Sequence, residues 1–173
     1  MDLLLFRHGI AQDRSAEVDD SDRPLTPRGI ERTRLAAVGL ARIAERPELV
    51  LSSPKTRAVQ TAHIVGQVFE REPEVWTELA DDTIDPLMHR LRDRGEDSVM
   101  LIGHEPTLTS LITRLCFRNV AGGAALGSIE LKKAGAALIE AGIGQYEPRR
   151  AGCLRWLIPP RALRALGEVQ VPV

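Results

Sequence analysis

Three short apolar segments without polar alternation constrain the fold of this chain more than any other feature of the sequence. They cover residues 3–6, 49–51 and 99–102 and contain only Leu, Val, Ile, Met and Phe. Such runs are typical of strands that are buried on both faces, as in a parallel sheet flanked by helices. The sequence therefore predicts an α/β fold, a three-layer α/β/α sandwich around a mostly parallel central sheet.

Each apolar segment stops at residues that are suited to binding phosphate. The segments that follow are Arg7-His8-Gly9, residues 52–57 (Ser-Ser-Pro-Lys-Thr-Arg) and residues 103–106 (Gly-His-Glu-Pro). Ligands of parallel α/β sheets bind outside the carboxyl ends of the strands. We therefore expect two arginines, Arg7 and Arg57, and two histidines, His8 and His104, to meet at one edge of the sheet.

Helices are predicted between the strands, mostly from a capping residue followed by proline. They cover about residues 26–45, 53–70, 85–94 and 106–117. Ser53 is interpreted as the cap of the second helix. The first strand and the first helix are joined by a long charged loop, and long loops in compact domains are often functional. Its acidic cluster Asp19-Asp20-Asp22 does not continue into an EF-hand pattern and is interpreted as solvated.

The last third of the chain has a different pattern. Ser128 to Leu131 and Ala136 to Glu140 flank a four-residue turn and predict an antiparallel hairpin at the edge of the sheet. Residues 156–160 and 163–166 are expected to pack back as an extended piece and a short helix. We interpret residues 1–173 as a single domain, with residues 150–173 as a C-terminal extension that packs on it.

Composition excludes several classes of function. A net charge of −1 gives no general attraction to nucleic acid or to acidic membranes. Cys116 and Cys153 are the only cysteines, and no Cys/His spacing fits a zinc site, so no metal is expected. No apolar run reaches transmembrane length, and the start of the chain lacks a basic leader. The sequence therefore predicts a cytoplasmic protein.

Two arginines and two histidines suit phosphoryl transfer. The planar fork of Arg forms two parallel charge-assisted hydrogen bonds to a phosphate dianion. A neutral imidazole can attack phosphorus, provided that its other nitrogen carries the proton and donates it to a group such as a backbone carbonyl. No metal or organic cofactor is expected, because the arginines supply the positive charge that Mg²⁺ supplies in other phosphoryl-transfer sites.

Four segments in this order resemble the histidine phosphatase superfamily, whose fold is the phosphoglycerate mutase-like α/β/α sandwich. Arg7-His8-Gly9 is similar to its RHG signature. The other matching segments are Arg23-Pro24-Leu25-Thr26 with Gly29, residues 52–62 with Arg57 and Thr61, and Gly103-His104-Glu105-Pro106. Four matches in order are far more specific than a lone triplet. The short chain and the Arg-Pro-Leu-Thr segment resemble the SixA-type phosphohistidine phosphatase subgroup.

The resemblance implies roles for individual residues. His8 is the expected nucleophile, which becomes phosphorylated. Arg7 and Arg57 are expected to clamp the phosphate, and His104 to complete the site. Arg23 occupies the place of a further arginine that contacts phosphate in this subgroup. By contrast, His63 and His89 lie on predicted helices without partner motifs and are expected to be structural or exposed.

The general acid is less well defined by the resemblance. Members of the wider family use a carboxylic acid to protonate the leaving oxygen, and Glu78 is the nearest match, with Asp81 and Asp82 as close rivals. An alkoxide needs such an acid, whereas imidazole that leaves from phosphohistidine needs less help. A weakly placed acid therefore fits a phosphohistidine or another activated substrate.

The expected function is hydrolysis of a phosphomonoester or phosphoramidate through a phosphohistidine enzyme intermediate. The favoured substrate is a phosphohistidine on a partner protein such as a phosphotransfer domain, because the short chain lacks long insertions that would enclose a small metabolite. Three alternatives stay open: a small-molecule phosphatase, a phosphoglycerate-type mutase, and an inactive module that binds phosphate or a phosphoprotein.

Overall fold

A single mixed sheet of six strands forms in the part of the chain that the computed structural model describes, residues 1–80, 83–117, 129–141 and 152–169. The order across the sheet is β3-β2-β4-β1-β5-β6. The strands are β1 (Asp2–Arg7), β2 (Leu49–Ser52), β3 (Glu74–Val75), β4 (Ser98–Gly103), β5 (Ala136–Glu140) and β6 (Cys153–Ile158). Neighbours among β1 to β4 are parallel, whereas β5 and β6 are antiparallel to theirs. The predicted parallel sheet with an antiparallel edge is confirmed.

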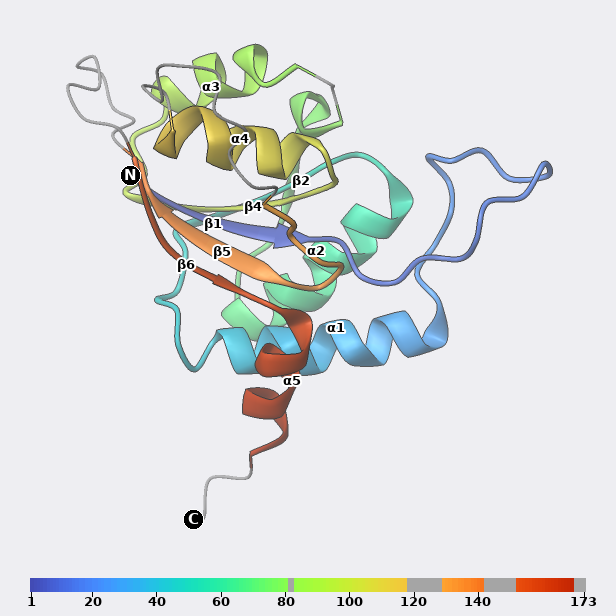
Figure 1. The fold of residues 1–173 in the computed structure, drawn as a ribbon. Coiled ribbons are helices and arrows are strands. Elements are labelled where there is room, and N and C mark those ends of the chain that lie inside the picture. The colour runs from blue at the N-terminus through green and yellow to red at the C-terminus, as the bar shows by residue number, and fades with distance from the viewer. Residues whose placement is uncertain (81–82, 118–128, 142–151, 170–173) are drawn as a thin grey trace.

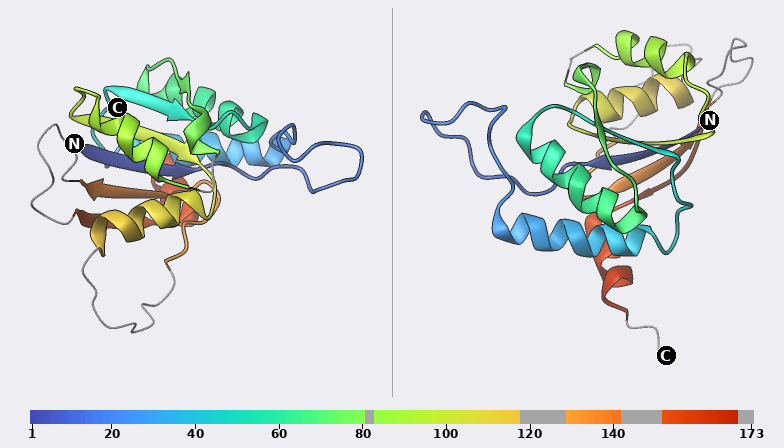
Figure 2. Two further views of the ribbon diagram at one scale, coloured as in Figure 1. Left: turned by 90° about the horizontal axis from the view of Figure 1, so that it is seen from above. Right: turned by 180° about the vertical axis from the view of Figure 1, so that it is seen from behind.

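Helices cover both faces of the sheet (Figure 1, Figure 2). One layer contains α1 (Pro27–Leu40), α2 (Thr56–Phe69) and α5 (Pro160–Glu168). The other contains α3 (Asp85–Arg92) and α4 (Thr107–Cys116), with the short 3₁₀-helix η1 (Thr77–Leu79) before them. Along β1, Leu3 and Leu5 pack toward α3 and α4, and Leu4 and Phe6 toward α1 and α2. An apolar side chain is therefore needed at every position, which explains the absence of alternation.

Helix α1 begins as the sequence predicts and ends earlier. The hydroxyl of Thr26 accepts a hydrogen bond from the amide of Gly29 at 2.9 Å, and Pro27 occupies the first turn. The helix was expected to continue to about Glu45, but it ends at Leu40. The next residues form tighter i→i−3 bonds, such as the one from the Ile43 amide to the Leu40 carbonyl at 3.0 Å.

The predicted hairpin is wrong. Residues 129–131 form no strand, and Ser128 lies outside the described residues. β5 instead pairs with β1 on one side and β6 on the other. The physical reason is the turn before β5, which bonds to the end of β1: the amide of Ala134 donates to the carbonyl of Arg7 at 3.0 Å, and the amide of Arg7 donates to the carbonyl of Gly135 at 3.1 Å.

The C-terminal part of the described chain adds the edge strand β6 and the helix α5. α5 lies close against α1 because both helices present glycine at the contact. A Cβ atom on Gly39 would lie 1.8 Å from the carbonyl oxygen of Leu163, and one on Gly167 would lie 2.1 Å from that of Leu35. Within the described ranges, no helix is long and apolar enough to cross a membrane.

Candidate active site

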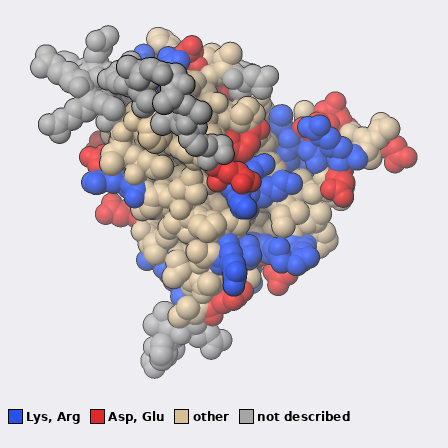
Figure 3. Space-filling model, in the orientation of Figure 1, with Lys and Arg blue, Asp and Glu red and all other residues tan. Residues whose placement is uncertain are grey.

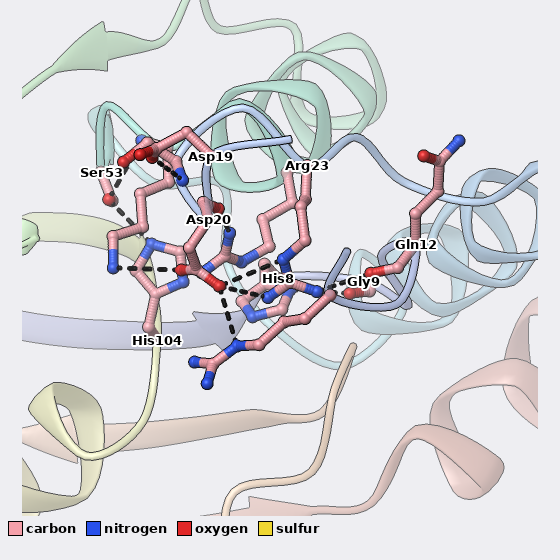
Figure 4. A network of polar contacts seen from close by, with 12 residues as sticks. His8, Gly9, Gln12, Asp19, Asp20, Arg23, Ser53 and His104 are labelled. Carbon is pink, nitrogen blue, oxygen red and sulfur yellow. Dashed lines mark hydrogen bonds and ion pairs between the residues drawn. The ribbon is translucent and has the colours of Figure 1, made fainter. Parts of the chain in front are cut away.

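The register of the sheet brings three strand ends to one edge. Arg7 of β1 is opposite Gly103 of β4, and Ser52 of β2 is opposite Ile102 of β4. The chain continues this register beyond the strands, because the amide of His8 donates to the carbonyl of Gly103 at 3.1 Å. Residues that are far apart in the sequence therefore form one polar cluster, as the sequence predicts (Figure 4).

His8 is held as a neutral imidazole with one defined tautomer. Its Nδ1 lies 2.7 Å from the carbonyl oxygen of Gly9. Because a carbonyl only accepts hydrogen bonds, Nδ1 carries the proton and Nε2 has a free lone pair. Burial, with smaller effects from Arg57 and Arg7, lowers the pKa of His8 to about 3. A neutral ring with an unprotonated Nε2 is the form that attacks phosphorus.

His104 lies beside His8, with ring centroids 4.9 Å apart. Its Nε2 is 2.8 Å from Oγ of Ser53, and that Oγ also accepts from the Lys55 amide at 3.4 Å. The hydroxyl proton of Ser53 can then be donated to Nε2, and we assign the ring proton to Nδ1. Burial lowers the pKa of His104 to about 3, so this ring is neutral as well. Nδ1 is buried and has no hydrogen-bond partner among the described residues.

Ser53 therefore belongs to the polar cluster through its contact with His104, which the sequence analysis did not predict. It is not the cap of α2, which begins at Thr56 after Lys55 and has no side-chain cap. Its side chain is fully buried and turns toward His104 instead. Its position directly after β2, whose neighbour β4 leads into His104, could have predicted this contact. The Ser-Pro sequence instead suggested a helix cap.

Arg7 and Arg57 each leave a buried donor without an acceptor among the described residues. Nη1 of Arg7 donates to the carbonyl of Leu131 at 2.8 Å. Nη2 of Arg57 donates to Oδ2 of Asp20 at 2.9 Å, and its Nη1 donates to the Asp20 carbonyl. Nε of both arginines is buried with no partner in the described chain. A buried unpaired donor costs about 1–3 kcal/mol, so donors left unpaired beside His8 favour an anion site.

Asp20 differs from the solvated acidic cluster that the sequence suggests. Asp19 and Asp22 are not buried, but the Asp20 carboxylate receives hydrogen bonds from Arg23, at 2.7 Å from Nη2, and from Arg57. These bonds, first that of Arg57 and then that of Arg23, hold the pKa of Asp20 far below its usual range. Arg23 also donates to the Gln12 carbonyl at 2.5 Å. Its predicted contact with phosphate stays a prediction.

Glu78, the candidate acid, has a partner of its own. Nη1 of Arg90 lies 2.9 and 3.1 Å from its two carboxylate oxygens, and the Arg90 guanidinium lies 3.8 Å above the ring of Trp76. A hydrogen bond to its own backbone amide and the Arg90 contact lower the pKa of Glu78. Its role as a proton donor stays a prediction. Asp81 and Asp82 lie outside the described residues.

The other histidines and the acidic side chains suggest no second centre. His63 and His89 are exposed on α2 and α3, as expected. In the described part of the chain, no three His, Cys, Asp or Glu side chains are grouped as metal ligands.

Known proteins resemble this chain both in sequence and in fold. Residues 3–87 match the model of the histidine phosphatase superfamily (branch 1). The chain is 34% identical to the phosphohistidine phosphatase SixA of Escherichia coli (strain K12), over 67% of this chain and 74% of that protein. It is 32% identical to an uncharacterized protein of Picosynechococcus sp., over 92% of this chain and all of that protein. The structure of the protein histidine phosphatase SixA complexed with tungstate matches with a TM-score of 0.75 and 28% identity, covering 94% of this chain and 99% of that one.

Proposed function

The chain belongs to the histidine phosphatase superfamily, and on that premise we propose that it removes the phosphoryl group from a phosphohistidine on a partner protein. The observation that carries this proposal is the state of His8. Its Nδ1 proton is donated to Gly9, its ring is neutral, and its Nε2 is free beside two arginines. The similarity to SixA, which is a phosphohistidine phosphatase, supports this substrate class.

In the first step, Nε2 of His8 attacks the phosphorus of the substrate. An Nε2–P bond forms while the bond between phosphorus and the substrate imidazole breaks. The substrate ring carries a proton on its other nitrogen before the transfer, keeps it, and therefore departs as a neutral imidazole. Arg7 and Arg57 stabilise the charge on the phosphoryl oxygens, and Nδ1–H of His104 is a further donor. The hydrogen bond to the Gly9 carbonyl stabilises the cationic ring that forms on His8.

In the second step, a water molecule attacks the phosphorus of the phosphorylated enzyme. An O–P bond forms, the Nε2–P bond breaks, and its electron pair returns to Nε2. The product is dihydrogen phosphate, and His8 is again neutral with its proton on Nδ1. Neither step moves a proton to or from Nε2, which agrees with a histidine whose pKa is lowered to about 3.

The surroundings of the site support an activated substrate on a large partner. Glu78 is ion-paired with Arg90 and has a lowered pKa, so it is held as a carboxylate and is a poor proton donor to a leaving alkoxide. A leaving imidazole has no such need. Near the site, a groove of about 620 Å³ is lined by Ile84, Pro106, Thr109, Ser110, Thr113, Arg114 and Phe117. One of its lining residues, Pro106, lies two residues after His104 in the chain. The groove offers room for a segment of the partner protein next to its phosphohistidine.

Trapping of the phosphorylated enzyme tests this proposal. Wild type, His8→Ala and the matched control His63→Ala are incubated with a ³²P-phosphohistidine protein and quenched in alkali. We expect alkali-stable, acid-labile label on wild type and on His63→Ala, and none on His8→Ala. If no variant takes up label or releases phosphate, the phosphohistidine proposal is wrong. Small phosphomonoesters, with phosphoglycerate among them, would then be assayed, followed by phosphate binding without turnover.

A further inference from the structure

The carboxylate of Asp20 lies among the cations that a phosphoryl group needs (Figure 4). Oδ1 accepts from Nη2 of Arg23 at 2.7 Å and from Nε of Arg14 at 3.1 Å. Oδ2 accepts from Nη2 of Arg57 at 2.9 Å and lies 3.8 Å from Nζ of Lys55. Four basic side chains therefore converge on one acidic group.

Arg57 is the side chain that Asp20 occupies most completely. Both of its terminal nitrogens donate to Asp20, one to the carboxylate and one to the backbone carbonyl. A guanidinium has five N–H donors, two on each terminal nitrogen and one on Nε, and it binds a phosphate through two neighbouring nitrogens. Asp20 uses one donor of each terminal nitrogen, while Nε of Arg57 has no partner among the described residues. The negative charge of Asp20 therefore lies directly beside the donors that Arg57 has left for an anion.

We propose that Asp20 is an internal competitor of the substrate phosphoryl group for Arg57, and that its negative charge weakens the binding of a phosphoryl dianion. This inference rests on the proposed function only in taking the Arg7, Arg57 and His8 cluster as the phosphoryl site. Asp20 holds the arginines in place without substrate, and the doubly charged phosphoryl group displaces a singly charged carboxylate.

The loop before Asp20 is exposed, whereas the backbone at Asp20 and Ser21 is attached to the start of α2, for example by the Thr56 amide, which donates to the Ser21 carbonyl at 2.8 Å. Residues 12–19 are exposed and form a loop that projects from the body of the molecule (Figure 1). Acidic and basic side chains lie side by side on this projection (Figure 3). The side chain of Asp20 itself is 35% exposed. Displacing it uncovers no apolar core, but the Arg57 side chain is only 5% exposed and needs an anionic partner. A phosphoryl dianion that takes the place of the carboxylate supplies that partner.

Competition and positioning make opposite predictions for Asp20→Asn. The variant keeps the shape of the side chain and removes its charge. If Asp20 competes, binding of inorganic phosphate becomes about three- to tenfold tighter, since one like charge near the anion is lost. If Asp20 instead orients Arg57 for substrate, binding becomes weaker.

The experiment measures the Kd of inorganic phosphate by isothermal titration calorimetry at about pH 8, where the dianion dominates. Asp22→Asn is the matched control, because this exposed residue of the same loop has no ion pair with the described residues. Asp20→Glu keeps the charge. We expect tighter binding for Asp20→Asn alone. Unchanged or weaker binding by a folded Asp20→Asn protein would overturn the inference.

This readout is separate from turnover of phosphohistidine. Tighter phosphate binding by Asp20→Asn without hydrolysis of the phosphoprotein would support the role of Asp20 and overturn the proposed substrate. Hydrolysis of the phosphoprotein together with unchanged phosphate binding by Asp20→Asn would support the proposed substrate and overturn the role of Asp20.

Discussion

The inner side of the site, formed by Arg7, His8 and His104, is held by the sheet, whereas the outer side, the loop 12–23, is held by ion pairs. On the inner side, partners are backbone groups and one buried hydroxyl, at Leu131, Gly9 and Ser53. On the outer side, most side-chain partners are charged groups that meet at Asp20, with backbone contacts such as that of the Thr56 amide to the Ser21 carbonyl at 2.8 Å. From this difference we expect the inner side to be fixed before substrate arrives and the charges of the outer side to respond to it.

The largest effect is expected on the inner side, from Arg7→Lys. Lysine keeps the charge and loses both the planar fork and the hydrogen bond to the Leu131 carbonyl. We expect kcat/KM for phosphohistidine hydrolysis to fall about 10²–10³-fold, as for loss of an oriented donor to a transition-state oxygen. Steady-state kinetics with a phosphohistidine protein check this. A loss of kcat/KM below threefold would mean that a positive charge at position 7 is sufficient for catalysis. The fixed geometry of the inner side would then give it no advantage over the outer side.

The pH dependence of stability gives the next effect. Because burial lowers the pKa of His8 from 6.5 to about 3, the unfolded state binds a proton first as the pH falls. The contribution of His8 to the free energy of unfolding is therefore fully present above about pH 6.5. It decreases toward pH 3 by up to about 1.4 kcal/mol per pH unit. Urea unfolding of wild type and His8→Gln between pH 6.5 and 4.5 should show a shallower slope for the variant.

The matched control for this slope is His63→Gln, which changes an exposed histidine on α2. Its slope should equal that of wild type. If His8→Gln is as steep as wild type, His8 is not held neutral by burial, and the inner side is more open to solvent than the structure indicates.

A smaller effect is expected from Ser53→Ala, which removes the partner of His104 Nε2. Without the hydroxyl, Nε2 and Nδ1 share the ring proton, and the donor toward the site is present only part of the time. We expect kcat to fall about tenfold with little change in KM, as for loss of one hydrogen bond. Ser52→Ala is the control, since this buried hydroxyl donates to the Ser53 carbonyl and not to His104. Equal losses in both variants would contradict the assigned tautomer.

The smallest effect is expected on the outer side, from Arg14→Ala. The Arg14 side chain is 82% exposed, and its contact with Asp20 is 3.1 Å long. Exposed ion pairs contribute little, so we expect a change in kcat/KM of less than about twofold. A tenfold loss in the same phosphohistidine assay would show that the outer side is as rigid as the inner one.

The sequence was sufficient for the inner side of the site because strand ends obey a general rule. Arg7 is the last residue of β1, and His8 and His104 directly follow β1 and β4, so pairing of these strands places the three residues together. Asp20 could not be found in this way. Its partner Arg57 lies on a helix, 37 residues further along the chain, and nothing in the spacing of a loop records such a contact. The hairpin failed for a related reason, since the partners of β5 are set by tertiary packing against β1 and β6.

The contact between α1 and α5 has a consequence for synthesis of the protein. The glycine-lined face of α1 is covered by a helix that begins 120 residues after α1 ends, from Leu40 to Pro160. At roughly 5–20 residues per second, that face is uncovered for about 6 to 24 s on the ribosome. β1, which carries Arg7, likewise waits for its partner β5. The nascent chain therefore contains His8 early, whereas α1 and β1 gain these partners only late in synthesis.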